Sequence, residues 1–191
     1  SIARNCIIHG ILGDGGSGSI AICNLYNDTT RYATIQNCTV SNCNRGIMTG
    51  SFSRVSNTVA LCNTLDFEMV DAANSSNNCS TDATAPGSNS LTGKLAAHNF
   101  VNVTPGAEDL HLKAGADCAN AGVNLFAQFN TDIDGEIRSG AWDIGADEEI
   151  PTTDVKLLRA GRTISAAARS ANEATITLTA AYPNNNLKVG Q

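Results

Sequence analysis

The sequence predicts an all-β protein whose coils of about 20 residues stack into a right-handed parallel β-helix, closed by an irregular β-rich cap with a C-terminal extension. Two columns of repeated residues support this prediction. Asparagines recur at spacings of 32, 20 and 21 residues, and Cys-Asn pairs recur at spacings of 20 and 19. Composition agrees, because only 5% of the 191 residues are aromatic and 16% are charged, which leaves few helix formers.

The asparagine column lies where each coil is expected to turn. Asparagine tolerates the left-handed backbone of tight turns, and stacked amide side chains can form a ladder. We therefore expect Asn37 and Asn57 to lie in adjacent coils, about 4.8 Å apart, as strand spacing requires. The full column comprises Asn5, Asn37, Asn57 and Asn78.

The second column consists of Cys23, Cys43 and Cys62. We interpret these residues as small buried thiols that face inward, one coil above another. Seven cysteines cannot all pair within one chain, so free thiols are favoured, although at least one disulfide remains an alternative. No histidine shares their register, which argues against a metal site or a nucleophile here.

The repeat also predicts the domain organisation. The first spacing of 32 fits one coil plus a loop of about 12 residues centred on residues 10–19. The repeat fades after Cys79. We expect coils over residues 1–92, a closing segment over 93–149 and an extension over 150–191.

Asp66 and Glu68 are the best candidates for a catalytic pair, because they lie two apart on one predicted strand. Pairing could raise the pKa of one carboxyl and create an acid and a base. The favoured interpretation makes both of them solvated residues of an outer face, with Phe67 and Met69 pointing inward. No lysine occurs in residues 1–85, so no base for a polysaccharide lyase is visible. The residues favour a non-enzymatic role.

The closing segment contains Asp132-Ile-Asp-Gly135, in which two carboxylates precede a glycine. Asp132 and Asp134 are weak calcium candidates, because the other ligands of a hand-type loop are missing. We favour a tight turn at Asp134-Gly135. Arg138 is expected to pair with Asp143 and hold this segment over the end of the solenoid. Trp142 is interpreted as a cap over the core rather than a sugar platform, and no cofactor besides calcium is considered.

The three histidines, His9, His98 and His111, are scattered along the chain. His111 lies between two leucines, and this alternation predicts a strand in which His111 faces solvent. No Ser–His–Asp arrangement follows from their spacing.

The extension differs from the rest in charge. Residues 150–191 carry five basic and two acidic residues, net +3, whereas residues 1–149 carry seven basic and sixteen acidic residues, net −9. Residues 174–182 alternate as one strand would. Such a short segment cannot build its own core. We expect it to dock on a neighbouring subunit, with packing along its own coils as the alternative.

Charge and hydropathy exclude two classes of protein. A net charge of −6 argues against a nucleic-acid binder, and no apolar run approaches the roughly 18 residues of a membrane span. The chain begins within a patterned stretch, so we expect it to be part of something longer.

Two stretches carry a family resemblance. Residues 100–122, and residues 131–138 together with 142–148, resemble the closing motifs of β-helix proteins of the choice-of-anchor Q type. This resemblance covers roughly residues 1–149 and implies an exported, surface-associated, structural or carbohydrate-facing protein. Similar β-helices form phage tailspikes, fibres and polysaccharide lyases, and fold alone does not choose between them. We expect a structural or adhesive module of an extracellular appendage, cell surface or virion that contacts polysaccharide. The alternative is the C-terminal part of a carbohydrate-active enzyme.

Overall fold

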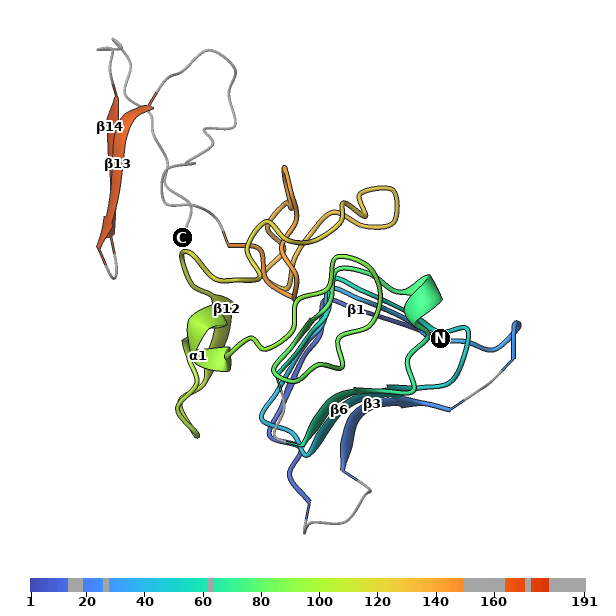
Figure 1. Cartoon of the computed structure of the whole chain (residues 1–191). Helices are drawn as coiled ribbons and strands as arrows, with labels where there is room; N and C mark the ends of the chain where they lie inside the picture. The colour runs from blue at the N-terminus through green and yellow to red at the C-terminus, as the bar shows by residue number, and fades with distance from the viewer. Residues whose placement is uncertain (14–18, 26–27, 62–63, 150–163, 171–172, 179–191) are drawn as a thin grey trace. The chain divides into compact units, whose positions relative to one another are not determined.

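The computed structural model describes the chain except for residues 14–18, 26–27, 62–63, 150–163, 171–172 and 179–191 (Figure 1). The described chain is all-β, and most of its sheets are parallel. Helix is limited there to α1 (Ala96–Asn99) and a 3-10 turn (Ala72–Asn74). The chain divides into two compact units, residues 1–149 and 150–191, which are described separately.

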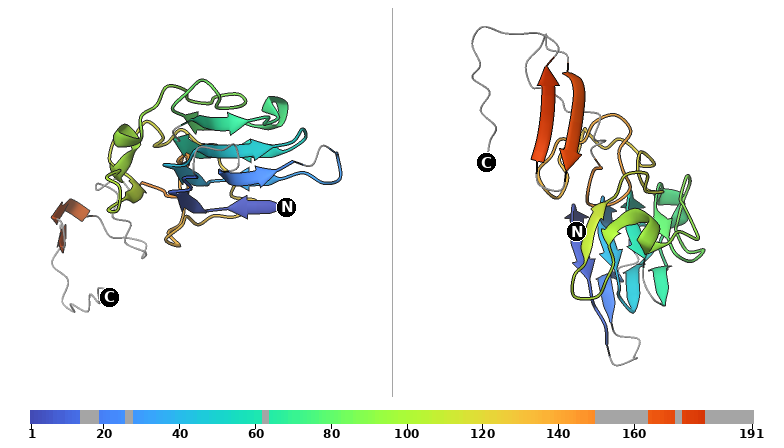
Figure 2. Two further views of the ribbon diagram at one scale, coloured as in Figure 1. Left: turned by 90° about the horizontal axis from the view of Figure 1, so that it is seen from below. Right: turned by 90° about the vertical axis from the view of Figure 1, so that its left-hand side faces the viewer.

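The N-terminal unit contains three parallel sheets, and the chain passes through one strand of each in turn. Strands from successive passes therefore lie side by side (Figure 2). The first sheet contains β1 (Ile2–Arg4), β4 (Thr34–Gln36) and β7 (Arg54–Ser56); the second contains β2 (Ile7–His9), β5 (Thr39–Ser41), β8 (Val59–Leu61) and β10 (Cys79–Ser80); the third contains β3 (Ile20–Asn24), β6 (Arg45–Thr49) and β9 (Leu65–Glu68).

Strand register shows where the chain departs from its 20-residue period. Thr39 pairs with Val59, and Arg45 pairs with Leu65, both at an offset of 20. The offset between the first two passes is 32 in the first two sheets but 25 in the third. The twelve extra residues are thus split, seven before β3 and five after it. The expected single loop centred on residues 10–19 is wrong, because surface connections at either end of β3 can lengthen without disturbing strand pairing.

The core lies between the three sheets. Ile35 stacks on Val55, and Ile47 stacks on Phe67, because these pairs occupy the same register in adjacent parallel strands. All four side chains are almost fully buried. Inward-facing residues of successive passes therefore form continuous apolar rows, and burial of this surface is the main driving force for stacking.

The predicted thiol column is wrong at Cys23. Cys23 is exposed and lies opposite Met48, because the five extra residues after β3 change the local offset from 20 to 25. Cys43 is buried, and Cys62 lies outside the described residues. Register instead places Cys6 beside Cys38, whose burial raises the pKa of its thiol to about 12. The six cysteines that the structure describes are free thiols: Cys6, Cys23, Cys38, Cys43, Cys79 and Cys118.

The segment 93–149 packs against the outer face of the second sheet. It begins with α1 and the antiparallel pair β11 (Phe100–Asn102) and β12 (Asp109–Leu112). Val59 of β8 contacts a second apolar cluster that includes Phe100 and Leu110, whereas its neighbour Ala60 faces the core between the sheets. The expectation that this segment covers the end of the stack is therefore wrong. Bridges from Leu91 to Cys79 and from Ser88 to Ser76 place residues 86–92 at that end instead.

The C-terminal unit contains β13 (Ile164–Ser170) and β14 (Glu173–Leu178), which form an antiparallel pair ending at Ser170 and Glu173. The sequence predicted one strand over residues 174–182, whereas two are present. The sequence analysis missed β13 because this strand consists mainly of alanine and serine, which give a weak alternation of apolar and polar residues. The remaining residues of the expected docking extension lie outside the described part. Within the described chain, no helix combines the length and apolar character that crossing a membrane requires.

Candidate functional site

A row of asparagines turns the chain between the first and second sheets. Asn5, Asn37, Asn57 and Asn77 have φ angles of 46°, 47°, 52° and 52°, in the left-handed region. Asparagine is one of the few residues other than glycine that adopts this conformation at small cost. These four residues are called the asparagine row below.

Asn77, not Asn78, is the fourth member of this row. The sequence alignment predicted Asn78, but Cys79 pairs with Val59, so the offset is 20 rather than 21. Asn78 is fully buried on the other side of the turn, where its amide donates to the carbonyl oxygen of Val55 at 2.8 Å. Two consecutive asparagines fit the alignment almost equally well, and only strand pairing distinguishes them.

Adjacent members of the row contact each other where their passes meet. The Asn57 amide nitrogen donates to Oδ1 of Asn37 at 3.2 Å, which is one rung of an amide ladder. Both side chains are fully buried. Their remaining donors and acceptors must therefore find partners elsewhere, because an unpaired buried amide is costly.

The backbone of the closing segment supplies those partners. Asn57 forms two hydrogen bonds with Val123, accepting from its N–H at 2.8 Å and donating to its carbonyl oxygen at 2.7 Å. The rest of the row donates in the same way, Asn5 to the Thr131 carbonyl oxygen, Asn37 to those of Asp143 and Gly145, and Asn77 to that of Ala121. The asparagine row thus turns the chain and also attaches the closing segment along the sheets.

Arg138 organises the interior of the closing segment. Its guanidinium donates to Glu148 Oε2 at 3.0 Å and to the carbonyl oxygens of Ala146 and Gly145 at 2.6 and 3.1 Å. The predicted partner was Asp143, and that pairing is wrong. Asp143 instead accepts backbone N–H groups, whereas Glu148 reaches the guanidinium. The sequence offered several acids within ten residues of Arg138 and no means of choosing among them.

Trp142 is fully buried inside the closing segment. Its ring packs edge-to-face on Phe129, with centroids 5.2 Å apart, and the Arg138 guanidinium lies 5.4 Å from its centroid. The sugar-platform interpretation requires an exposed ring face, which this position does not provide. Trp142 therefore belongs to the small core of the closing segment.

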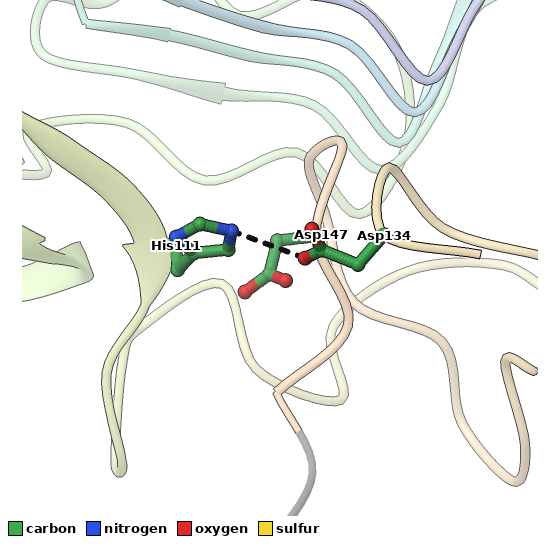
Figure 3. A group of neighbouring side chains, drawn as sticks. All are labelled: His111, Asp134 and Asp147. Carbon is green, nitrogen blue, oxygen red and sulfur yellow. Dashed lines mark hydrogen bonds and ion pairs between the residues drawn. The ribbon is translucent and has the colours of Figure 1, made fainter. Parts of the chain in front are cut away.

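A histidine and two carboxylates meet where β12 lies beside later loops of the closing segment (Figure 3). His111 lies on β12, Asp134 in the turn after Asp132, and Asp147 near the end of the N-terminal unit. One potential ligand atom from each of the three lies within 4.8 Å of the others. His111 Nε2 is 3.0 Å from Asp134 Oδ2, and its Nδ1 is 2.5 Å from Asp109 Oδ1.

The two calcium candidates, Asp132 and Asp134, have different hydrogen-bond partners. Oδ1 of Asp132 accepts N–H groups of Asp134 and Glu136 at 3.0 and 2.8 Å, which closes the turn at Gly135. Asp134 projects instead toward His111. The sequence missed this cluster because its members lie 23 and 36 residues from His111. The Asp109-Leu-His111 spacing, which places both polar side chains on one strand face, was the available local signal.

Asp66 and Glu68 each have a structural partner. Asp66 is 1% exposed, and its Oδ2 accepts N–H groups of Thr81 and Asp82 at 2.6 and 3.2 Å. Glu68 forms an ion pair with Arg45 at 3.0 Å. The expected solvated face is wrong for Asp66, and Met69 is exposed rather than inward-facing.

Asp143 makes the stability of the N-terminal unit depend on pH. Burial raises the pKa of its carboxyl from 3.8 to about 7, against the charge-stabilising N–H donors of Asn120 and Glu149. Because the folded pKa exceeds the unfolded one, its contribution is complete below pH 4 and is lost as the pH rises to 7. This difference corresponds to about 4 kcal/mol.

We therefore expect the Asp143→Asn variant to show a flatter dependence of unfolding free energy on pH between 4 and 7 than the parent. Urea titrations at several pH values measure this. Burial also raises the pKa values of Asp147 and Glu148, which contribute with the same sign, whereas Asp28 and Asp71, whose pKa values are lowered, contribute with the opposite sign. These groups are present in both proteins, so the difference reports Asp143 together with its coupling to Glu148. Parallel profiles would contradict the raised pKa.

Comparisons of the chain with family models, with curated proteins and with solved structures gave no match. Function is therefore inferred from the parallel sheets, the asparagine row and the side-chain clusters of this chain.

Proposed function

We propose that the chain is a right-handed parallel β-helix module with a structural or adhesive role in an extracellular appendage, a cell surface or a virion. The observation that carries this proposal is the register. Strands of three parallel sheets recur at an offset of 20, and the same asparagine turn recurs with them. A chain that repeats one coil in this way builds a stiff rod whose length grows with coil number.

The polar residues of the repeat support a structural role. The asparagine row is consumed by turns and by attachment of the closing segment. Asp66 and Glu68, the candidates for acid–base chemistry, are held by backbone N–H groups and by Arg45. A glycosidase needs two carboxyl groups facing one substrate bond, and this pair has other partners.

Location and partners are part of the same proposal. The resemblance of residues 100–122, 131–138 and 142–148 to the closing motifs of choice-of-anchor Q proteins supports an exported protein that contacts polysaccharide. The opposite charges of residues 1–149 and 150–191 support self-association in which the extension of one subunit docks on the acidic body of another.

Sedimentation of the full chain and of residues 1–149 tests this assembly. We expect the full chain to form oligomers and the truncated chain to remain a folded monomer, since its core lies within residues 1–149. Its circular dichroism spectrum should keep the β-sheet signal and lose only the contribution of β13 and β14. Equal stoichiometry of the two would remove the extension as the connector.

A parallel assay separates the structural role from the enzymatic alternative. The full chain is incubated with neutral and acidic polysaccharides, and both bound protein and released reducing ends are measured. We expect binding without release. Release that disappears in Asp66→Asn or Glu68→Gln would establish the carbohydrate-active enzyme instead, with Glu108→Gln as a control outside that pair.

A further inference from the structure

We propose that His111, Asp134 and Asp147 bind a divalent transition-metal ion of the Zn²⁺ type, with Asp109 as the residue that orients His111. The ion would join β12 to the later loops of the closing segment that carry Asp134 and Asp147. This inference is independent of the proposed function, because it rests on side-chain geometry and not on the β-helix assignment.

The three ligand atoms are close to the arrangement that such an ion needs. They lie within 4.8 Å of one another, whereas ligands of tetrahedral Zn²⁺ are about 3.3 Å apart. His111 Nε2 and Asp134 Oδ2 are already at 3.0 Å. Asp134 has 51% of its side chain exposed and can follow the ion without disturbing packing.

Asp109 is not a ligand in this proposal, but its contact with His111 supports the site. Its Oδ1 lies 2.5 Å from His111 Nδ1, on the ring side opposite Nε2. Histidines that ligate metals usually donate their second ring N–H to a carboxylate, which fixes the tautomer and raises the basicity of the ligating nitrogen. With Nδ1 donating to Asp109, Nε2 donates to Asp134 at 3.0 Å when no ion is bound, and an ion would displace that proton and take the Nε2 lone pair.

Asp147 is the buried ligand of the proposed site. It is only 5% exposed, and the Leu112 N–H, at 2.6 Å, is the one hydrogen-bond donor to its carboxylate within the described chain. A buried carboxylate with a single neutral donor is costly unless a positive charge lies close by. Protonated His111 supplies such a charge when no ion is bound, and a divalent ion in place of the Nε2 proton would supply a larger one between Asp147 and Asp134.

The mixed donor set decides which ion is expected. Ca²⁺ takes six to eight oxygen ligands, whereas one imidazole nitrogen and two carboxylates suit Zn²⁺ and leave a position for water. His111 and Asp109 also line a depression of about 370 Å³, together with His9 and Glu108. The ligand atoms themselves are open to solvent through the half-exposed side chains of His111 and Asp134.

Calorimetric titration of the full chain with ZnCl₂, after treatment with EDTA, tests the site. We expect one Zn²⁺ per chain and at least tenfold weaker binding in His111→Asn and in Asp134→Asn. The asparagine at 111 keeps a donor for Asp109 but removes Nε2. His98→Asn, which removes an exposed histidine on α1, is the matched control and should bind as the parent does.

Titration with Co²⁺ separates this site from the cysteines. We expect visible bands of four- or five-coordinate Co²⁺ without a thiolate charge-transfer band, because no cysteine belongs to the ligand set. The midpoint of thermal unfolding should rise with Zn²⁺ in the parent and not in His111→Asn. Absence of Zn²⁺ binding, binding unchanged in both variants, or a thiolate band at one equivalent would each overturn the proposal.

Discussion

Replacement of Arg138 by methionine is expected to lower the free energy of unfolding of the N-terminal unit by roughly 3–5 kcal/mol. The guanidinium is fully buried and bonds to Glu148 and to the carbonyl oxygens of Gly145 and Ala146. Methionine fills most of the volume but leaves the Glu148 carboxylate without its ion-pair partner. The cost is therefore an unpaired charge and free carbonyl groups rather than a cavity.

Urea unfolding followed by tryptophan fluorescence measures this effect, because Trp142 is the single tryptophan and packs beside Arg138. Circular dichroism of the same samples reports the sheets. The double variant Arg138→Met with Glu148→Gln is the control: removing both charges should recover part of the loss. A loss below about 1 kcal/mol in the single variant would contradict the role of Arg138 as the centre of the closing segment.

The second large effect is expected from Asn57→Ala, at roughly 3–5 kcal/mol. About 1–2 kcal/mol comes from placing alanine at φ 52°, where its Cβ crowds the carbonyl oxygen. The rest comes from three lost hydrogen bonds, two to the partly exposed backbone of Val123 and one to the buried amide of Asn37, at about 0.5–1.5 kcal/mol for each bond.

Two further variants separate these causes. Asn57→Gly accepts the left-handed backbone, so it should lose only the hydrogen-bond part. Asn89→Ala, at an exposed turn with φ 57°, should lose only the backbone part, about 1 kcal/mol. Hydrogen exchange of the Val123 amide should accelerate in both Asn57 variants and not in Asn89→Ala. Unchanged protection of that amide in Asn57→Gly would show that the asparagine row does not hold the closing segment.

Features that depend on neighbouring residues could be predicted from the sequence. The all-β class and the period of 20 follow from short alternating runs and recurring asparagines, because strand and turn preferences act over a few residues. Asn37 and Asn57 lie in equivalent turns for the same reason. The period of 20 was enough to predict which residues occupy equivalent positions in successive coils, although it says nothing about hydrogen bonds between the strands.

Features that depend on exact register needed the tertiary structure. A shift of one residue exchanges Asn77 for Asn78, and five additional residues place Cys23 opposite Met48. The alternating pattern that predicts β4–β9 repeats along the chain, so a prediction that is shifted by one or a few residues fits it nearly as well. Only backbone pairing across the sheets, which buries one set of side chains and exposes the other, decides between the alternatives.

The candidate site depended on the tertiary structure even more strongly. Arg138 had several acids within reach in sequence, and burial together with carbonyl geometry selected Glu148. His111 was interpreted as a surface residue of an isolated strand, because its partners Asp134 and Asp147 come from segments much later in the chain. The sequence by itself determined the repeat and the residue types of the closing segment, since local conformational preferences encode both. Packing of that segment on the outer face of the second sheet decided which charges meet, because contacts between distant segments form only when apolar surfaces such as Val59 and Phe100 are buried together.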